Sequence, residues 1–299
     1  MKLRDLPGVL RFVWNHPLTR GQRADALVRL VRWQVGSRLA PGPVVVDFVG
    51  GSRLLVRPGM AGATGNVYAG LHDFEEMSFV LHALRPGDTF VDVGANVGSY
   101  TVLASAVAGA DCLAIEPVPS VFECLCDNVA LNRVRHKARC FNVAAGARPG
   151  TASFTSTLDT VNRVALASDS GAGLIRVPVS TLDEVAGETR PAVVKIDVEG
   201  YETEVVSGAE RVLDRAELSA VIMELNGAGA AYGFDEAALN RRMLDRGFRT
   251  FSYLPFERRL VEVSREGSSA VNAIYVRNLE LVAERVRTAR AFSVLGHTV

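Results

Sequence analysis

The stretch FVDVGANVGSYT, residues 90–101, joins an apolar run ending at Asp92 to an apolar, helix-compatible segment through a turn bracketed by two glycines. A strand, a glycine turn and a helix in this order form the ligand-binding start of a doubly wound α/β sheet. A dinucleotide-binding turn requires G-x-G-x-x-G, but Asn96 and Ser99 occupy its second and third glycine positions. The chain also lacks the G-x-x-x-x-G-K-[ST] sequence of a P-loop. The turn therefore predicts a nucleoside ligand without phosphates.

Short apolar runs alternate with longer amphipathic segments from Thr89 onward, a pattern typical of parallel strands joined by helices. Seven strands are predicted, at residues 89–93, 112–115, 138–142, 192–197, 218–224, 248–253 and 270–276. A helix is predicted at 71–85, and Ser120 and Glu123 fit a capping box that would start the helix after the second strand. The predicted fold class is α/β: a Rossmann-like, doubly wound sheet of seven mostly parallel strands with an N-terminal appendage of helices and strands.

The sequence pattern divides the chain into three parts. Residues 1–72 are expected to form an N-terminal cap of helices and short strands, residues 73–277 the ligand-binding core, and residues 278–299 a C-terminal helix or tail. Periodicity fades between about 146 and 179, where small and polar residues accumulate. We therefore expect an insertion with short strands there, and long insertions in such sheets often lie over the active site.

The N-terminal 40 residues are basic. They carry eight Lys and Arg against two Asp, a net charge of +6, and the rest of the chain balances this to zero. Such an arm could direct the protein to nucleic acid, anionic lipid or a phosphate-bearing substrate. We favour a cap helix with a solvated face, in which Leu27, Leu30, Val31 and Val35 recur at helical spacing and face the core.

Composition places the chain among ordinary globular proteins. Its 299 residues are 48% hydrophobic and 22% charged, enough to bury a large core. The longest uncharged stretch, residues 93–110, contains glycines and polar residues, which argues against a transmembrane segment. No secretion signal is evident. The four cysteines contain no C-x-x-C pair and are expected to be reduced core thiols, so the cytoplasm is the expected compartment.

Glu116 follows the second predicted strand, 24 residues after Asp92. A carboxylate there can accept both hydrogen bonds of a ribose diol, and S-adenosylmethionine combines such a diol with a sulfonium and an amino-acid tail. Asp92 could face the cationic tail, and Glu75 or Glu76, on the preceding helix, could bind its ammonium group. The alternative is that these carboxylates only cap helices or stay solvated. The predicted cofactor-binding residues are Glu75, Asp92, Gly94, Asn96, Gly98, Tyr100, Glu116 and Pro117.

A second group of carboxylates lies in VVKIDVEGYETEVVSGA, residues 193–209. If the backbone stays extended, Asp197 and Glu199 point to one face at the end of the fourth strand. Either could take a proton from an acceptor hydroxyl, and Lys195 is expected mainly as an ion-pair partner for one of them. Alternatively, Glu199 has no catalytic role and only stabilises the start of the next helix, because its negative charge interacts favourably with the helix dipole.

A divalent cation is the alternative use of these carboxylates. Asp197 and Glu199, with Glu224 and Asn226 of the fifth strand's end, could bind an ion that lowers the pKa of a sugar diol. We favour the base, so no metal is predicted. Lys195, Glu224 and Asn226 are instead assigned to acceptor binding.

These segments resemble the FkbM-type S-adenosylmethionine-dependent methyltransferases. The resemblance rests on FVDVGANVGSYT, AIEPVPSVFECLCDNVALN, STLDEV, VVKIDVEGYETEVVSGA and VIMELN, over roughly residues 73–227. It implies the class I methyltransferase fold, with an antiparallel last strand, and O-methylation of sugars or polyketide-derived natural products. It also implies cofactor roles for Asp92, Gly94, Asn96, Gly98 and Glu116, with Asp197 and Glu199 near the acceptor.

The leading hypothesis is therefore an S-adenosylmethionine-dependent O-methyltransferase with a glycoside or polyketide-like acceptor. An N-methyltransferase and a degenerate binding module without turnover are the alternatives. Nucleic acid is disfavoured as a partner, because the core has no interleaved basic and aromatic pattern and no N-P-P-[YF] motif. The sequence leaves the oligomeric state open, including a homo-oligomer.

Overall fold

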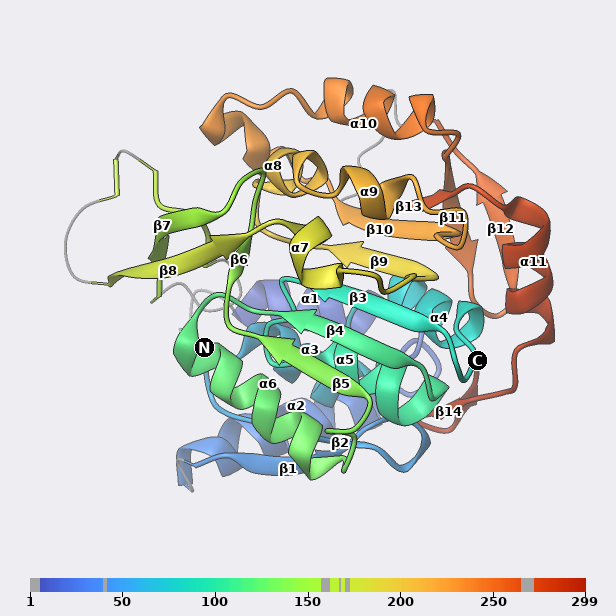
Figure 1. Ribbon diagram of the computed structural model, residues 1–299. Helices are drawn as coiled ribbons and strands as arrows, with labels where there is room; N and C mark the ends of the chain where they lie inside the picture. Colours follow the sequence, from blue (N-terminus) through green and yellow to red (C-terminus); the bar gives the residue numbers. More distant parts are fainter. Residues whose placement is uncertain (1–5, 40–41, 157–161, 167, 170–172, 265–271) are drawn as a thin grey trace.

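An eight-stranded sheet runs through the centre of the molecule (Figure 1). The computed structural model describes residues 6–39, 42–156, 162–166, 168–169, 173–264 and 272–299. In spatial order the strands of the sheet are β5 (Ala138–Phe141), β4 (Asp111–Ile115), β3 (Thr89–Val93), β9 (Val193–Ile196), β10 (Ala220–Glu224), β13 (Asn272–Val276), β11 (Arg249–Leu254) and β12 (Arg259–Glu262).

The seven predicted strands are all present, and the last of them, β13, is antiparallel to both of its neighbours. Strands β5, β4, β3, β9 and β10 are parallel. The eighth strand, β12, was not predicted; it pairs antiparallel with β11 at the edge of the sheet. Because carboxyl ends of parallel strands meet at one edge, the segments that follow β3, β4, β9 and β10 gather on the same side.

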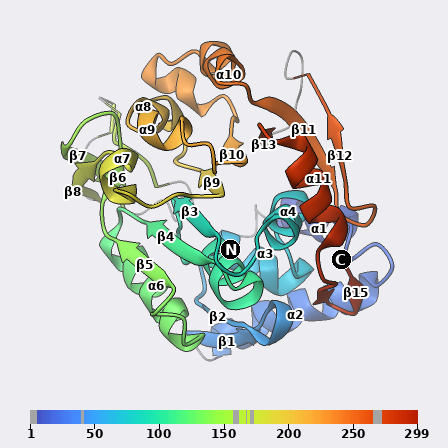
Figure 2. The ribbon, with the colours of Figure 1, turned by 45° about the vertical axis from the view of Figure 1, so that its right-hand side comes forward.

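Both faces of the sheet are apolar and covered by helices, as a doubly wound fold requires. In β3, Phe90 belongs to one buried apolar cluster, whereas Val91 and Val93 belong to the cluster on the opposite face. The first face is covered by α4 (Phe74–Ala83), α5 (Ser99–Val102) with its π-helical continuation η3 (Leu103–Ala108), α6 (Pro119–Leu131) and α11 (Leu279–Thr288). The second is covered by α7 (Leu182–Ala186), α8 (Glu202–Ser207), α9 (Glu210–Leu213) and α10 (Glu236–Asp245). Figure 2 shows α11 beside α4.

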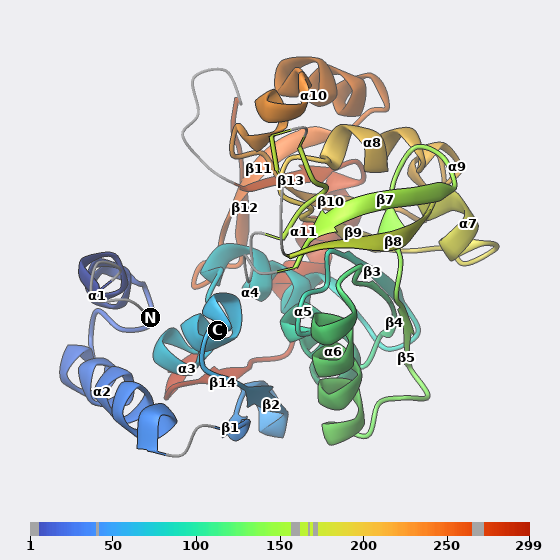
Figure 3. The same ribbon diagram turned by 90° about the vertical axis from the view of Figure 1, so that its left-hand side faces the viewer.

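A small second sheet stands beside the carboxyl edge of the first. It is made of β6 (Ala144–Ala145), β8 (Leu174–Ser180) and β7 (Gly150–Thr155), in that order. Figure 3 shows β7 and β8 lying across the ends of the central strands. A short 3-10 helix, η5 (Ala228–Tyr232), follows β10, and the chain ends in β14 (Ser293–Val294) and β15 (His297–Thr298).

The N-terminal elements pack against α5 and α6. They are α1 (Leu6–Asn15), α2 (Arg23–Leu39), the hairpin of β1 (Val44–Asp47) and β2 (Arg53–Val56) with η2 (Val49–Gly51) between its strands, and α3 (Ala61–Ala69). Asn128 of α6 and Asn132, directly after that helix, connect the edge of β2 to the core. Asn128 accepts from the Leu55 N–H at 2.6 Å and donates to the Val97 carbonyl at 2.8 Å, and Asn132 exchanges hydrogen bonds with the backbone of Arg53.

Two local predictions were wrong. The capping box at Ser120 and Glu123 does not form, because α6 already begins at Pro119, a favourable first helical residue. The α2 helix also presents a different face to the core: Leu30 is buried, but Val31 and Val35 are 57% and 51% exposed. Its buried side instead includes Ala26, Leu30 and Trp33, since the bulky indole contributes more apolar area than the valines.

The structure also bears on membrane and redox predictions. Among the described residues, none of the helices combines the length and apolar character that crossing a bilayer requires. The four cysteines are free thiols; Cys112 and Cys124 are buried as expected, whereas Cys126 and Cys140 are half-buried.

Because Asn128 bonds both Leu55 and Val97, we expect Asn128→Leu to cause a large loss of stability. This change keeps the branching at Cγ but adds bulk at a fully buried position and leaves a part-buried N–H and a buried carbonyl unpaired, so the free energy of unfolding should fall by roughly 2–4 kcal/mol. Asn132→Leu is the control, because water can reach its partners, and should cost about 1 kcal/mol. Denaturant unfolding measures both; equal losses would contradict the proposed role of Asn128.

Candidate active site

The turn after β3 is held open by left-handed residues. Gly94, Asn96 and Gly98 have φ values of 76°, 51° and 88°. A side chain at Gly94 would be impossible without rearrangement, since its Cβ would lie 1.8 Å from the Asp197 carbonyl oxygen. Gly98 is similarly crowded, with a Cβ position 2.6 Å from Leu125.

The backbone N–H groups of this turn are already paired within the protein. Those of Gly94 and Ala95 donate to the Ile115 carbonyl, and that of Gly98 donates to Ala95. The other two are taken by side chains: Asn96 N–H donates to Glu116 at 2.9 Å, and Val97 N–H donates to Asn96 Oδ1 at 2.8 Å. Dinucleotide-binding turns leave such groups free for phosphate oxygens, so this turn is unsuited to a pyrophosphate.

Glu116 is positioned from three directions at the end of β4. One carboxylate oxygen accepts from Asn96, and the other accepts from Val118 N–H at 2.9 Å. Asn142 donates to the backbone carbonyls of Glu116 and Pro117, which fixes the segment from behind. Burial raises the pKa of Glu116 to about 7, although the two N–H donors oppose this shift.

Asp73, immediately before α4, forms the opposite wall. Its carboxylate accepts from the Tyr100 hydroxyl at 3.0 Å, and it is about one-third exposed. The Lys195 ammonium lies 4.8 Å from the centre of the Tyr100 ring and 2.7 Å from Asp197. Burial would lower the pKa of Lys195, but the charges of Asp197 and Asp92 and its hydrogen bond to Asp197 raise it above its usual value.

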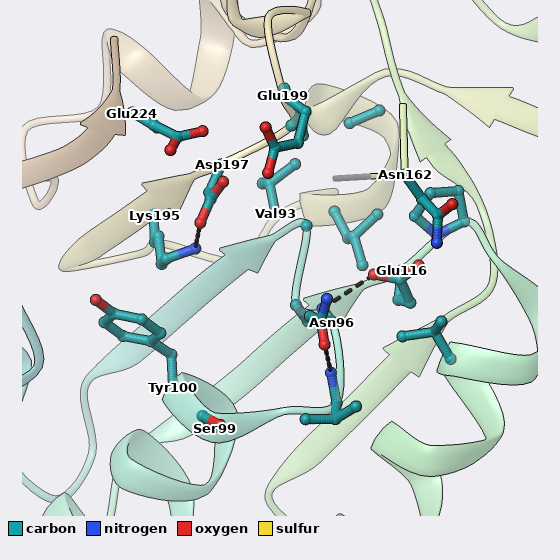
Figure 4. A pocket seen from close by; sticks show the side chains of 18 of the residues that line it. Val93, Asn96, Ser99, Tyr100, Glu116, Asn162, Lys195, Asp197, Glu199 and Glu224 are labelled. Atoms are coloured by element: carbon teal, nitrogen blue, oxygen red, sulfur yellow. Dashed lines mark hydrogen bonds and ion pairs between the residues drawn. The ribbon is translucent and has the colours of Figure 1, made fainter. Parts of the chain in front are cut away.

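Three carboxylates meet at the ends of β9 and β10. One oxygen from each of Asp197, Glu199 and Glu224 lies within 4.8 Å of the others (Figure 4). Burial and the charge of Asp197 raise the pKa of Glu199 to about 7. Burial, the charges of Asp197 and Glu199, and a hydrogen bond to Asp197 raise the pKa of Glu224 to about 9. At neutral pH, therefore, Glu224 holds a proton that it shares with Asp197.

The backbone that carries Glu199 is not extended, contrary to the prediction. Glu199 has a φ of 56° and Gly200 a φ of 99°, both in the left-handed region. The turn is held by Glu202, whose carboxylate accepts from Val198 and Gly200 N–H groups at 3.2 and 3.1 Å. Glu202 thus stabilises the turn at the start of α8, whereas Glu199 lines the cavity.

These groups line one cavity of about 290 Å³, close to the lower limit for small-molecule sites. Figure 4 shows Glu116 and Asn162 at one end and Lys195, Asp197, Glu199 and Glu224 at the other. Val93, which Figure 4 shows beside Asp197 and Glu199, adds apolar surface to the lining, as do Ile115, Val121 and Phe154. The cavity therefore combines apolar surface with a single carboxylate, Glu116, at one end and a strongly charged group at the other.

A family model described as the methyltransferase FkbM domain matches residues 92–250, more than half of the chain. The chain belongs to the FkbM methyltransferase family. The resemblance in the sequence motifs is thereby confirmed, and the parallel sheet with its antiparallel strand has the expected class I arrangement.

Individual relatives of this FkbM-family chain are distant. It is 28% identical over 148 residues to the hexuronic acid methyltransferase AglP of Haloferax volcanii, covering 49% of this chain and 59% of the length of that relative. A methyltransferase FkbM from Methylobacillus flagellatus is similar in structure with a TM-score of 0.44, 14% identity and coverage of 85% of this chain and 60% of that one. A TehB-like methyltransferase from Corynebacterium glutamicum gives a TM-score of 0.41, 12% identity and coverage of 73% and 95%.

Most of the residues predicted for the site of this FkbM-family chain line the cavity. They are Gly94, Asn96, Tyr100, Glu116, Pro117, Lys195, Asp197, Glu199 and Glu224. The predicted ion pair of Lys195 with a carboxylate is present.

Four predicted residues lie elsewhere. Asp92 is fully buried and accepts a hydrogen bond from Thr101 at 2.7 Å, so it supports α5 instead of facing a ligand. Gly98 shapes the turn without lining the cavity. Glu75 lines a separate hollow, and the Asn226 side chain accepts from Ala228 N–H in an exposed loop.

Three residues of the site were not predicted from the sequence: Asp73, Glu202 and Asn162. Asp73 lies inside the helix predicted at 71–85, but it directly precedes the observed α4; starting that helix after the aspartate, where an N-cap carboxylate is common, could have identified it. Glu202 lies at the start of the next helix, where acidic residues are favoured. Asn162 carries no comparable signal, because it lies in the insertion without periodicity.

The proton on Glu224 predicts a pH-dependent stability. Its pKa is about 9 in the folded protein against an ordinary 4.5, so its stabilising contribution is complete below about pH 4.5 and lost as the pH rises toward 9. Glu224→Gln, which stays neutral, should raise the free energy of unfolding relative to the wild type by roughly 4 kcal/mol more at about pH 8 than at about pH 5. Thermal unfolding at both pH values measures this. The exposed Glu280→Gln is the control, and an equal effect of Glu224→Gln at both pH values would refute the buried proton.

Proposed function

We propose that this chain transfers a methyl group from S-adenosylmethionine to a hydroxyl of a small molecule, with a sugar as the favoured acceptor. The observation that carries this proposal is the shared cavity, which has Glu116 at one end and the group of Asp197, Glu199 and Glu224 at the other. A donor that occupies the Glu116 end would have its far end beside the carboxylates.

The residues of the Glu116 end suit S-adenosylmethionine, which supplies a methyl group on a positively charged sulfur. Glu116 retains oxygen lone pairs for a ribose diol, since each of its oxygens accepts only one backbone hydrogen bond. Val121 and Phe154 offer an apolar surface to the adenine ring. Asp73, on the opposite wall beside Tyr100, offers a carboxylate to the ammonium group of the amino-acid tail. The paired N–H groups of the turn suit a ligand without phosphates.

Glu199 is assigned as the base. Asp197 is engaged by Lys195 and by the proton of Glu224, whereas in the described part of the chain no hydrogen bond or ion pair engages the Glu199 carboxylate. Its pKa of about 7 matches a base that works near neutral pH. In this assignment Glu199 accepts the hydroxyl proton while the oxygen forms a bond to the methyl carbon, and the electron pair of the broken carbon–sulfur bond stays on sulfur.

A sugar fits the other groups around Glu199. Lys195 and the carboxylates can hydrogen-bond neighbouring hydroxyls of a polyhydroxylated ring. Tyr201 lines the cavity and is supported edge-to-face by Tyr232 and Phe234, with ring centres 5.5 and 5.9 Å away; such a ring can pack on the C–H face of a sugar. The name of the relative from Haloferax volcanii, a hexuronic acid methyltransferase, points to the same class. A polyketide-type hydroxyl or an amine is the alternative acceptor.

The same carboxylates could in principle bind a divalent cation. Their oxygens are close enough together, but Glu224 holds a proton and Lys195 already neutralises Asp197. A cation would have to displace both, so the donor set fits a proton-transfer site better than a metal site.

Binding of S-adenosylhomocysteine, the demethylated donor, tests the role proposed for the Glu116 end of the cavity. In Glu116→Gln an amide NH2 replaces one acceptor oxygen, faces a backbone N–H and can no longer accept from the ribose. The affinity of this variant for S-adenosylhomocysteine, measured by calorimetry, should fall roughly tenfold or more. Glu75→Gln, whose carboxylate lies outside the cavity, is the matched control and should bind like the wild type. Unchanged affinity in Glu116→Gln would contradict the proposal that Glu116 binds the ribose of the methyl donor.

Catalysis is tested by transfer of labelled methyl groups to hexuronic acid glycosides, neutral glycosides, polyketide alcohols and amines. With a hydroxyl acceptor, the rate of the wild type should rise with pH through about 7 as Glu199 loses its proton. Glu199→Gln should lose roughly 100-fold to 10,000-fold in rate and flatten this profile, while binding S-adenosylhomocysteine normally. Loss of activity in a chelator, restored by Mg²⁺, would instead favour the cation, and efficient transfer to amines alone would overturn the O-methyl assignment.

A further inference from the structure

An apolar stripe runs along the solvent side of α2. Val28, Val31, Val35 and Leu39 are 45%, 57%, 51% and 81% exposed. Their spacing places them on one side of the helix, opposite the buried residues Ala26, Leu30, Trp33 and Ser37. The helix is thus apolar on two sides, although only one of them packs against the described core.

Helix α1, which packs against α2, also carries exposed apolar side chains. Leu10 and Trp14 lie one turn apart and are 38% and 48% exposed. Figure 3 shows α1 and α2 together at the margin of the fold, with α3 on the inner side of α2. The exposed apolar side chains of α1 and α2 are together called the outward face; they are Leu10, Trp14, Val28, Val31, Val35 and Leu39. Exposed apolar groups gathered in this way mark an interaction surface.

Arginines flank the outward face. Residues 6–39 contain six arginines and one aspartate, a net charge of +5, and five of the arginines are exposed: Arg11, Arg20, Arg23, Arg32 and Arg38. The Arg23 guanidinium lies over the Trp14 ring, 4.5 Å from its centre. Only Arg29 turns inward, where it donates to the Tyr68 carbonyl. An apolar face with tryptophan and flanking arginines is the composition of helices that lie in the headgroup region of a membrane.

We propose that the outward face docks on an anionic lipid surface. Charge complementarity selects this occupant, because anionic headgroups can neutralise the exposed arginines while the apolar side chains enter the boundary with the acyl chains. A second copy of the chain is a poorer match: a symmetric contact along α2 would bring Arg32 and Arg38 of both copies into one interface. This docking is independent of the methyl transfer proposed above.

Vesicle flotation of the full chain tests the proposal. The wild type should float with phosphatidylcholine vesicles that contain phosphatidylglycerol, not with phosphatidylcholine alone, and binding should weaken as salt is raised. Val31→Asp with Val35→Asp should weaken binding roughly tenfold or more. The matched control is Leu244→Asp with Leu281→Asp, which adds the same charges at positions that are 40% exposed on α10 and α11; it should bind like the wild type. Arg32→Gln with Arg38→Gln should reduce the preference for anionic vesicles.

Three outcomes would overturn the proposal. The first is no flotation of the wild type with anionic vesicles. The second is equal loss of binding in the α2 variant and the control. The third is a dimer in sedimentation that the α2 variant alone dissociates, with no vesicle binding, which would assign the outward face to a second copy. Circular dichroism verifies that the variants are folded.

Discussion

The close approach of two backbone segments at the edge of the sheet constrains the whole site. The turn after β3 passes the Asp197 carbonyl so closely that only glycine fits at position 94. This contact places the loop that carries Asp197 and Glu199 directly beside the turn whose Asn96 N–H holds Glu116. Both ends of the cavity are therefore fixed by backbone geometry, and the parallel pairing of β4, β3, β9 and β10 sets the distance between them.

The site gathers several carboxylates in a buried region, where water solvates their negative charge poorly. Burial raises the pKa of Asp92, Glu116, Glu199 and Glu224 alike, so each ionised carboxylate opposes folding to some degree. Lys195 is the main compensation, since it pairs with Asp197 from within the sheet. The two apolar clusters that sandwich the strands supply the stability that such a cavity requires. Raised pKa values of this kind are typical of functional sites.

The fold could largely be predicted from the sequence because its signals are local. Apolar runs and glycine turns located seven strands, and the spacing of Glu116 located one end of the cavity. The failures involve tertiary packing: Asp73 joins the site because of how α4 docks, and Glu199 reaches the cavity through a left-handed turn held by Glu202. The choice of the buried face of α2 likewise depends on what packs against Trp33, which periodicity alone does not reveal.

A crystal structure of the chain with S-adenosylhomocysteine tests the central claim, that one cavity holds the donor at Glu116 and the acceptor at the carboxylates of β9 and β10. The account predicts both ribose hydroxyls within hydrogen-bond distance of Glu116 and the sulfur directed toward Glu199. A ligand bound elsewhere, or one whose sulfur points away from Glu199, would contradict it.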